Sequence, residues 1–144
     1  LEWFIEKAVE IGVDEITPVI CRYSERKQVK YDRLEKIVLS ACKQSVQAVF
    51  PLLHPQTSFD ELVKNSKAEC KTIAHCYPLD KVDFRKPGAA ASDILILIGP
   101  EGDFSLEEVE MAEAHGFVAV SLGDSRLRTE TAGIMACAAM VHTH

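Results

Sequence analysis

The sequence predicts an α/β fold in which a mostly parallel sheet is flanked by helices. Three observations predict it. The segment Ile94–Ile98 (ILILI) is continuously apolar, as expected for a strand that helices cover on both faces. Strand-like and helix-like segments alternate along the chain. The length of 144 residues, of which 47% are hydrophobic, suits a single domain with a sizeable core, so we expect one domain over residues 1–144.

Composition and charge exclude several classes of protein. No apolar run approaches the roughly 20 residues that a membrane helix needs, and no secretory signal is recognisable, so we expect a soluble, cytoplasmic protein. The 5 cysteines contain no CxxC pair and the 5 histidines have no metal-ligand spacing, so neither a disulfide framework nor a metal site is predicted. The net charge of -6 opposes contact with a polyanion, so any nucleic-acid binding must be local or must use a segment absent from this chain.

Two elements and a loop are predicted before residue 31. Apolar residues at helical spacing predict a helix from Leu1 that stops at Gly12, because glycine is common just after a helix C-terminus. The segment Glu15–Cys21 (EITPVIC) is typical of a strand. Arg22–Lys30 is a polar loop whose cations, with neighbouring tyrosines, form either an RNA-contacting patch or a merely solvated surface.

The middle of the chain is predicted to contain two helices and a strand. Asp32–Glu35 (DRLE) is an acidic variant of the capping box and predicts a helix that ends before Pro51. Ser58–Glu61 (SFDE) repeats the pattern and predicts a second, shorter helix. Thr72–Cys76 (TIAHC) has the character of a buried strand, and residues 81–92 have the proline, glycine and small residues of a loop.

The last third is predicted to contain two strands and two helices. After Ile94–Ile98, Ser105–Glu108 (SLEE) predicts the start of a helix that stops at Gly116. Phe117–Leu122 (FVAVSL) predicts a strand, and Glu130–Met140 a helix whose small and Met side chains pack either in the chain's own core or in a dimer interface. Ligands of such folds bind beyond the carboxyl ends of the strands, where we expect the functional site.

Two glycine-bearing loops follow the two late strands. They are Gly99–Ser105 (GPEGDFS) and Gly123–Thr131 (GDSRLRTET). Glycine permits close approach of the main chain to a bound cofactor, although a pair of tight strand-to-helix turns explains the same residues. Neither loop matches G-x-G-x-x-G, and the chain contains no P-loop and no G-x-S-x-G elbow. Dinucleotide binding, nucleoside-triphosphate binding and acyl transfer are therefore disfavoured.

These loops carry a resemblance to a known family. Ile98–Ser105 (IGPEGDFS) resembles the I-G-P-E-G-G-F-S motif, and Leu122–Ala132 (LGDSRLRTETA) resembles the L-G-x-R-I-L-R-x-E-T-A motif, of the RsmE family. Lys7–Val13 (KAVEIGV) and Ala41–Ser45 (ACKQS) resemble further segments of that family, so the resemblance covers essentially the whole chain. RsmE proteins are SPOUT-type methyltransferases that act on uridine N3 of 16S ribosomal RNA.

The resemblance implies both an architecture and an activity. The implied fold is α/β with a trefoil knot at the C-terminal end, and the implied assembly is a homodimer. A knot contradicts the general rule against threaded chains, so residue patterns alone do not predict it. The implied activity is S-adenosylmethionine-dependent methylation of 16S ribosomal RNA. The resemblance also implies an N-terminal β-barrel RNA-binding domain that is absent from this chain.

The resemblance further implies that backbone groups of three loops bind S-adenosylmethionine. The first loop lies near His75 to Tyr77, and the other two are the motif loops. Glu101 either orients its loop or faces the partner subunit. The implied cofactor-binding residues are His75, Ile98, Gly99, Pro100, Glu101, Gly102, Asp103, Leu122, Gly123, Arg126, Leu127 and Thr129.

Two residues of the last loop are candidates for the chemistry. Methylation of uridine N3 requires removal of the N3 proton and stabilisation of the developing anion. Arg128 either holds the uracil oxygens with its fork of donors, or contacts a phosphate, or forms an ion pair with Glu130. Glu130 either accepts the N3 proton or caps the last helix, and the capping role is sufficient on its own.

The chain departs from the family pattern at several positions. Asp103 stands where glycine is usual and adds a negative charge beside the cofactor loop, although aspartate tolerates a left-handed backbone. Ser125 replaces an arginine and Arg126 is displaced by one position, while Lys43 and Gln47 replace an acidic residue and an arginine. Two alternatives therefore stay open: a related SPOUT enzyme with another RNA target, and a non-catalytic module that binds cofactor or RNA.

Overall fold

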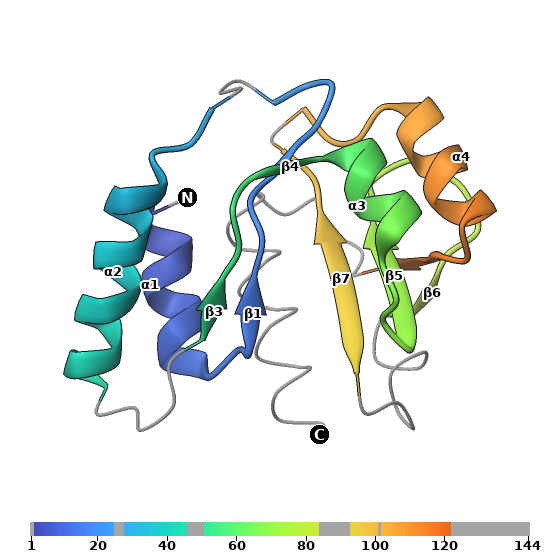
Figure 1. Cartoon of the computed structure of the whole chain (residues 1–144). Coiled ribbons are helices and arrows are strands. Elements are labelled where there is room, and N and C mark those ends of the chain that lie inside the picture. Colours follow the sequence, from blue (N-terminus) through green and yellow to red (C-terminus); the bar gives the residue numbers. More distant parts are fainter. Residues whose placement is uncertain (1, 25–27, 46–50, 84–92, 101, 122–144) are drawn as a thin grey trace.

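The computed structural model describes residues 2–24, 28–45, 51–83, 93–100 and 102–121. Every strand pair among them is parallel, and helices pack beside the strands, which confirms the predicted α/β fold (Figure 1). The largest sheet has the strand order β6-β8-β5-β7. The elements are α1 Glu2–Ile11, β1 Glu15–Ile16, β2 Val19–Ile20, α2 Tyr31–Gln44, β3 Leu52–Leu53, β4 Thr57–Ser58, α3 Phe59–Asn65, β5 Cys70–Ala74, β6 Val82–Asp83, β7 Ile94–Ile98, α4 Leu106–Ala114 and β8 Val118–Ser121.

Two apolar cores divide the described residues into two halves. The helical half consists of α1, α2, β1 and β3, on the left of Figure 1, and the sheet half consists of the four-stranded sheet with α3 and α4. In the helical half, an apolar stripe along α2 is buried against α1. Helix α1 ends as predicted at Gly12, whose φ of 102° is left-handed and whose N–H donates to the carbonyl of Ala8 at 3.1 Å. The core residues of this half are Ile5, Ala8, Val9, Ile16, Leu34, Val38, Ala41, Cys42 and Leu53.

Two predictions for the first half of the chain are wrong in detail. The segment Glu15–Cys21 forms two short strands that pair with different partners, because Pro18 has no N–H to continue a ladder. The carbonyl of Pro18 instead accepts a hydrogen bond from the Thr57 N–H at 3.1 Å. Helix α2 begins at Tyr31, one residue before the predicted capping box, and its N-cap Lys30 makes no side-chain cap. Asp32 therefore lies in the first turn, where its charge still suits the helix dipole.

The sheet half also differs from the predicted strand boundaries. Strand β5 starts and ends two residues before the predicted Thr72–Cys76, because it runs in register with β7 from Cys70 opposite Ile94 to Ala74 opposite Ile98. Strand β6 lies within the predicted loop 81–92 and pairs with β8. Strand β7 is present as predicted, but it is one of the two edge strands of the described sheet, and Leu97 is its only buried residue.

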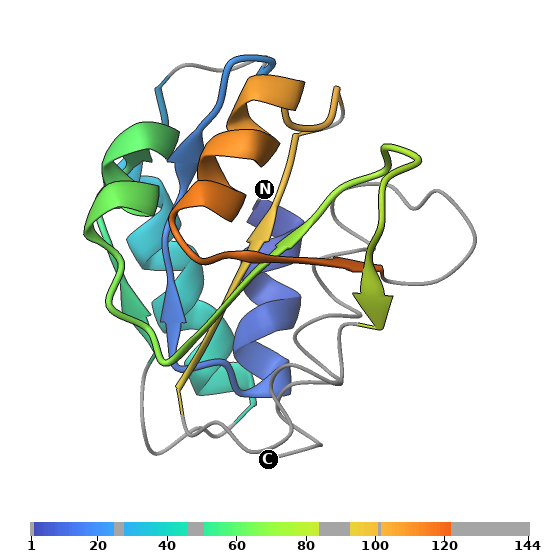
Figure 2. The same cartoon turned by 90° about the vertical axis from the view of Figure 1, so that its right-hand side faces the viewer.

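The caps of the sheet-half helices follow the predicted signals. The Ser58 hydroxyl accepts a hydrogen bond from the Glu61 N–H at the start of α3. Ser105 and Glu108 form a complete capping box at the start of α4, and Gly116, with φ of 87°, follows its end. Helices α3 and α4 lie together on one side of the sheet (Figure 2).

Several predictions lie outside the described residues. The predicted knot and the predicted helix Glu130–Met140 involve residues 122–144, so both stay predictions. Among the described helices, none has both the length and the apolar character needed to cross a membrane.

Candidate functional site

The predicted ligand site lies at the carboxyl ends of β5 and β7. These strands are neighbours and end level with each other, Ala74 opposite Ile98, so the loops that follow them leave the same edge of the sheet. Strand β8 pairs with β5 on its other side and places Val120 opposite Ala74. The first two of the three expected cofactor loops are thus brought together. The third, residues 122–129, lies outside the described residues, although it follows directly from β8.

Asp103 links the two described loops through hydrogen bonds. One carboxylate oxygen accepts from the Cys76 N–H at 2.9 Å and the other from the Phe104 N–H at 2.7 Å. The backbone of Asp103 is left-handed, with φ of 67°, and its N–H donates to the carbonyl of Pro100 at 2.8 Å. The turn therefore tolerates aspartate, as predicted, and the carboxylate crosses to the neighbouring loop, which the sequence did not indicate.

Tyr77 adds a second link between these loops. Its hydroxyl donates to the carbonyl of Phe104 at 2.7 Å. Burial is the main cause that raises the pKa of this phenol, and the Asp103 carboxylate acts in the same direction. The phenol therefore stays protonated at neutral pH and remains a hydrogen-bond donor.

His75 is the buried histidine of the site. Its side chain packs beside the Tyr77 ring, its Nδ1 accepts a hydrogen bond from the Tyr77 N–H at 3.1 Å, and only 5% of the residue is exposed. Burial, and to a smaller extent the Lys81 cation, lowers the pKa of the imidazole. A neutral ring that accepts at Nδ1 carries its hydrogen on Nε2. That Nε2 is buried and has no hydrogen-bond partner among the described residues.

The two described glycines of the first motif have close neighbours within the protein. A Cβ at Gly99 would lie 3.1 Å from both the backbone nitrogen and the ring of Phe104. A Cβ at Gly102 would lie 3.2 Å from the Cβ of Tyr23. A side chain at either position would require its neighbour to shift by a few tenths of an ångström, so packing inside the protein favours glycine at both, in agreement with the turn interpretation.

Glu108, in the first turn of α4, connects the end of the loop 99–105 to Arg22 through hydrogen bonds. Both Glu108 oxygens are used: one accepts from the Ser105 N–H at 2.7 Å and the other from the Arg22 N–H at 3.1 Å. The side chain of Arg22 lies 3.9 Å from Glu107 and over the ring of Tyr23. Sequence reasoning identified Glu108 as a cap but missed its second partner, which is distant in sequence.

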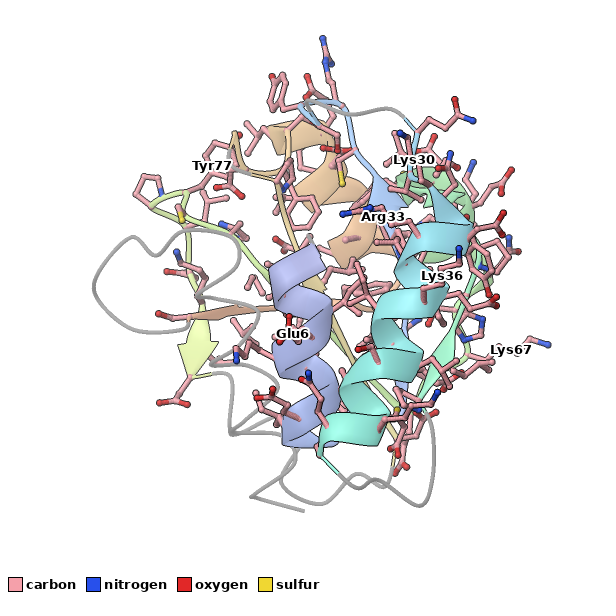
Figure 3. All side chains as sticks on the ribbon, turned by 90° about the vertical axis from the view of Figure 1, so that its left-hand side faces the viewer. Glu6, Lys30, Arg33, Lys36, Lys67 and Tyr77 are labelled. Atoms are coloured by element: carbon pink, nitrogen blue, oxygen red, sulfur yellow. The ribbon has the colours of Figure 1, made fainter. Side chains whose placement is uncertain are left out.

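The predicted basic loop divides between two places. Arg22 and Tyr23 lie beside α4, whereas Lys30 lies at the start of α2 with Arg33 and Lys36. We call Lys30, Arg33 and Lys36 the α2 basic edge. It borders an open groove of about 780 Å³, also lined by Gln28, Val29, Tyr31 and Asp32. Figure 3 shows the three cations along α2, with Tyr77 on the opposite side of the view.

Among the described residues there is no group of three or more His, Cys, Asp or Glu side chains arranged to hold a metal ion.

The predicted site residues divide into those within and those outside the described part of the chain. The described members of the predicted site are His75, Ile98, Gly99, Pro100, Gly102 and Asp103. The members outside the described residues are Glu101, Leu122, Gly123, Arg126, Leu127, Arg128, Thr129 and Glu130.

This arrangement defines a parallel α/β domain whose predicted ligand site lies in loops at the carboxyl ends of adjacent strands. The RNA methyltransferase domain family matches residues 1–141, and the chain belongs to that family. A similar protein is the Ribosomal RNA small subunit methyltransferase E of Mesomycoplasma hyopneumoniae, which is 31% identical over 92% of this chain and 60% of its own length. The relatives bearing this name confirm the RsmE resemblance that the two motifs predicted.

Solved structures agree with this assignment. The probable rRNA-methyltransferase of Porphyromonas gingivalis is 46% identical with a TM-score of 0.87, covering 94% of this chain and 58% of that chain. The Ribosomal RNA small subunit methyltransferase E of Neisseria gonorrhoeae, solved bound to S-adenosyl methionine, is 36% identical with a TM-score of 0.85, covering 96% of this chain and 59% of that chain. The chain thus spans somewhat over half the length of these relatives.

Proposed function

We propose that this chain is the catalytic domain of an S-adenosylmethionine-dependent RNA methyltransferase that modifies uridine N3 of 16S ribosomal RNA. The observation that carries the proposal is the pairing of two loops at one sheet edge: the IGPEGDFS loop after β7 lies hydrogen-bonded to the loop after β5. Relatives that share this fold are named ribosomal RNA methyltransferases, and one of the solved structures holds S-adenosyl methionine.

The described residues of these loops offer polar groups to a cofactor. The buried Nε2–H of His75 offers a donor without a partner among the described residues, and the loop Gly99–Asp103 turns tightly through the Asp103-to-Pro100 hydrogen bond. When bound, S-adenosylmethionine supplies an electrophilic methyl group. The task of the chain is to hold the acceptor base in line with that group and to remove its proton. The third loop, from Leu122 to Thr129, completes the proposed site.

For the last loop, the proposal gives Arg128 the role of holding the uracil oxygens and favouring the deprotonated base, rather than a phosphate contact or an ion pair with Glu130. Glu130 either accepts the N3 proton or caps the last helix. Substituting Arg128→Ala in the full-length protein is expected to lower methyl transfer far more than cofactor affinity. Equal losses of transfer and affinity would refute the catalytic role.

The proposed RNA partner requires local positive charge, because the chain as a whole carries a net charge of -6. The α2 basic edge supplies three exposed cations beside an open groove. The proposal includes a homodimer and a cytoplasmic location, and it includes the β-barrel RNA-binding domain that the RsmE resemblance implies for the full-length protein.

Cofactor binding tests the proposal directly. Calorimetry should detect S-adenosylmethionine binding to the chain, and adenosine alone should bind more weakly. Alkylation of Cys76, which is exposed in the loop after β5, should slow when the cofactor is present, while alkylation of the half-buried Cys70 serves as the matched control. Gly99→Trp is a poor test, because any Cβ there meets Phe104.

Three outcomes distinguish the open alternatives. Binding together with methylation of a uridine N3 in 16S ribosomal RNA, mapped in cells with and without the gene, supports the proposal. Binding with methylation of another RNA supports a related SPOUT enzyme. Absence of S-adenosylmethionine binding favours a non-catalytic module and overturns the enzyme assignment.

A further inference from the structure

The loop after β5 uses its own main-chain donors internally. The Cys76 N–H donates to the Asp103 carboxylate and the Tyr77 N–H donates to the His75 ring. Each N–H has one hydrogen to donate, so neither group is available to a ligand. Two carbonyls of the loop each accept one hydrogen bond as well, that of His75 from Lys81 at 3.0 Å and that of Tyr77 from the Leu79 N–H at 2.8 Å. The N–H groups of Cys76 and Tyr77 are therefore not available to the cofactor, although the resemblance implied recognition by backbone groups of this loop.

One buried polar atom of the same loop has no hydrogen-bond partner among the described residues. The Nδ1 of His75 accepts the Tyr77 N–H, so the hydrogen of the neutral ring is on Nε2. This Nε2–H is buried and has no acceptor among the described residues. A buried donor without a partner is costly, and native proteins retain few of them. Its position directly after β5, at the sheet edge where the cofactor loops meet, indicates that an acceptor on a ligand completes it.

We infer that the Nε2–H of His75 is the hydrogen-bond donor through which the loop after β5 binds the cofactor. This inference rests on the proposed function, and it assigns to a side chain the role that main-chain groups were expected to have. The acceptor is a polar atom of the adenosyl or amino-acid part of S-adenosylmethionine.

Asp103 is the positioning residue for this donor. Its carboxylate holds the Cys76 N–H and thereby fixes the residue that separates His75 from Tyr77. The hydroxyl of Tyr77 donates to the carbonyl of Phe104, which fixes Tyr77 as well. With both neighbours fixed, the ring keeps one orientation and one tautomer. A glycine at position 103 would remove the acceptor of the Cys76 N–H and release this loop.

Two substitutions of His75 separate its two nitrogens. His75→Asn keeps an acceptor near the Nδ1 position, able to accept from the N–H two residues later, but does not reach the Nε2 position. His75→Gln reaches the Nε2 position with an amide N–H and lacks the Nδ1 acceptor. We expect His75→Asn to weaken S-adenosylmethionine binding about tenfold or more, the loss expected for one buried hydrogen bond, and His75→Gln to retain most of the affinity.

The readouts are calorimetry, thermal unfolding and the ring resonances of His75. In the unsubstituted chain, long-range proton–nitrogen spectra should show the Nε2–H tautomer, and the Nε2 signal should shift when S-adenosylmethionine is added. Equal affinity of His75→Asn and the unsubstituted chain overturns the inference. So does equal weakening by both substitutions, because that result assigns His75 only a structural role.

Asp103 provides a second, independent pair of variants. Asp103→Gly should weaken S-adenosylmethionine binding and speed alkylation of Cys76 in the absence of cofactor, while Asp103→Asn, which retains one acceptor, should be intermediate. Unchanged affinity in Asp103→Gly overturns the positioning role. If the unsubstituted chain fails to bind S-adenosylmethionine, the proposed function and this inference both fall, whereas binding that is insensitive to His75 overturns only the inference.

Discussion

The helical half and the sheet half bury different kinds of side chain. The buried core of the helical half is apolar throughout, whereas all four buried polar or charged residues in the described part of the chain belong to the sheet half. They are Thr72, His75, Ser105 and Glu108. A buried polar group costs free energy unless it is hydrogen-bonded, and its bonds fix its orientation. The helical half therefore serves mainly to stabilise the fold. The sheet half buries polar groups at some cost in stability, and their hydrogen bonds fix the geometry of the predicted site.

Removal of a large core side chain from each half should give the largest effects. Phe104 is 1% exposed and its ring lies 5.4 Å from that of Phe59, so Phe104→Ala should cost about 3–5 kcal/mol of unfolding free energy. Ile5→Ala in the helical half should cost about 2–5 kcal/mol. Denaturant unfolding measures both.

Cofactor affinity then separates the two core variants. The remaining folded Phe104→Ala protein should bind S-adenosylmethionine weakly, because the Phe104 ring packs against the loop at Gly99. The folded Ile5→Ala protein should bind normally. Equal loss of affinity in both variants would remove the distinction between the halves.

The next largest effect on stability is expected at two glutamates, Glu61 and Glu108, which each lie three residues after the N-cap serine of their helix. Glu108→Ala removes the acceptor of two main-chain N–H groups, those of Ser105 and Arg22, and should cost about 2–4 kcal/mol. Glu61 occupies the matching position of α3 but is exposed, so Glu61→Ala should change stability by less than about 0.5 kcal/mol. Thermal unfolding compares them, and similar costs would contradict the importance of the Arg22 contact.

A smaller effect is the pH dependence contributed by His75. Burial, and then Lys81, lowers its pKa in the folded chain, while the carboxylates of Asp103 and Glu113 act more weakly in the opposite direction. The unfolded chain therefore binds a proton near the ordinary pKa of about 6.5 before the folded chain does. Stability should fall as the pH drops through and below that value, and His75→Gln should flatten this part of the profile. A profile that is unchanged in His75→Gln would show that other groups cause it.

The smallest effect is expected at the α2 basic edge of the helical half. Lys30→Ala combined with Lys36→Ala should weaken RNA binding by a few fold and reduce its salt dependence by about two charges. Lys67→Ala, on an exposed lysine just after α3, is the control. Filter binding at several salt concentrations measures both, and an equal effect of Lys67→Ala would indicate nonspecific attraction.

The helix ends that depend on local signals were predicted correctly. Gly12 and Gly116 act through their own left-handed backbone, and the Ser105 hydroxyl accepts a hydrogen bond from the N–H of Glu108, three residues later. Features that depend on pairing with a distant strand were predicted wrongly. The interruption at Pro18 and the short strand β6 depend on which strand lies alongside, which neighbouring residues do not specify.

The meeting of two predicted loops was foreseen from the sequence, but the hydrogen bonds between them were not. The motif loop after β7 and the loop at His75 were identified, and the structure brings them together. The hydrogen bond from Cys76 to Asp103 spans residues far apart in sequence and depends on a left-handed turn, so no local pattern indicates it. For the same reason, the unpartnered Nε2 of His75 became visible only from its burial.

The contact between Gly102 and Tyr23 constrains how this sequence can change. Because a Cβ at position 102 would lie 3.2 Å from the Cβ of Tyr23, any side chain at 102 requires the main chain at 23 to move. Arg22, the residue before it, is anchored by Glu108, which resists that movement. Positions 23, 102 and 108 are therefore expected to covary among homologues, as one evolutionary unit assembled from two distant parts of the gene.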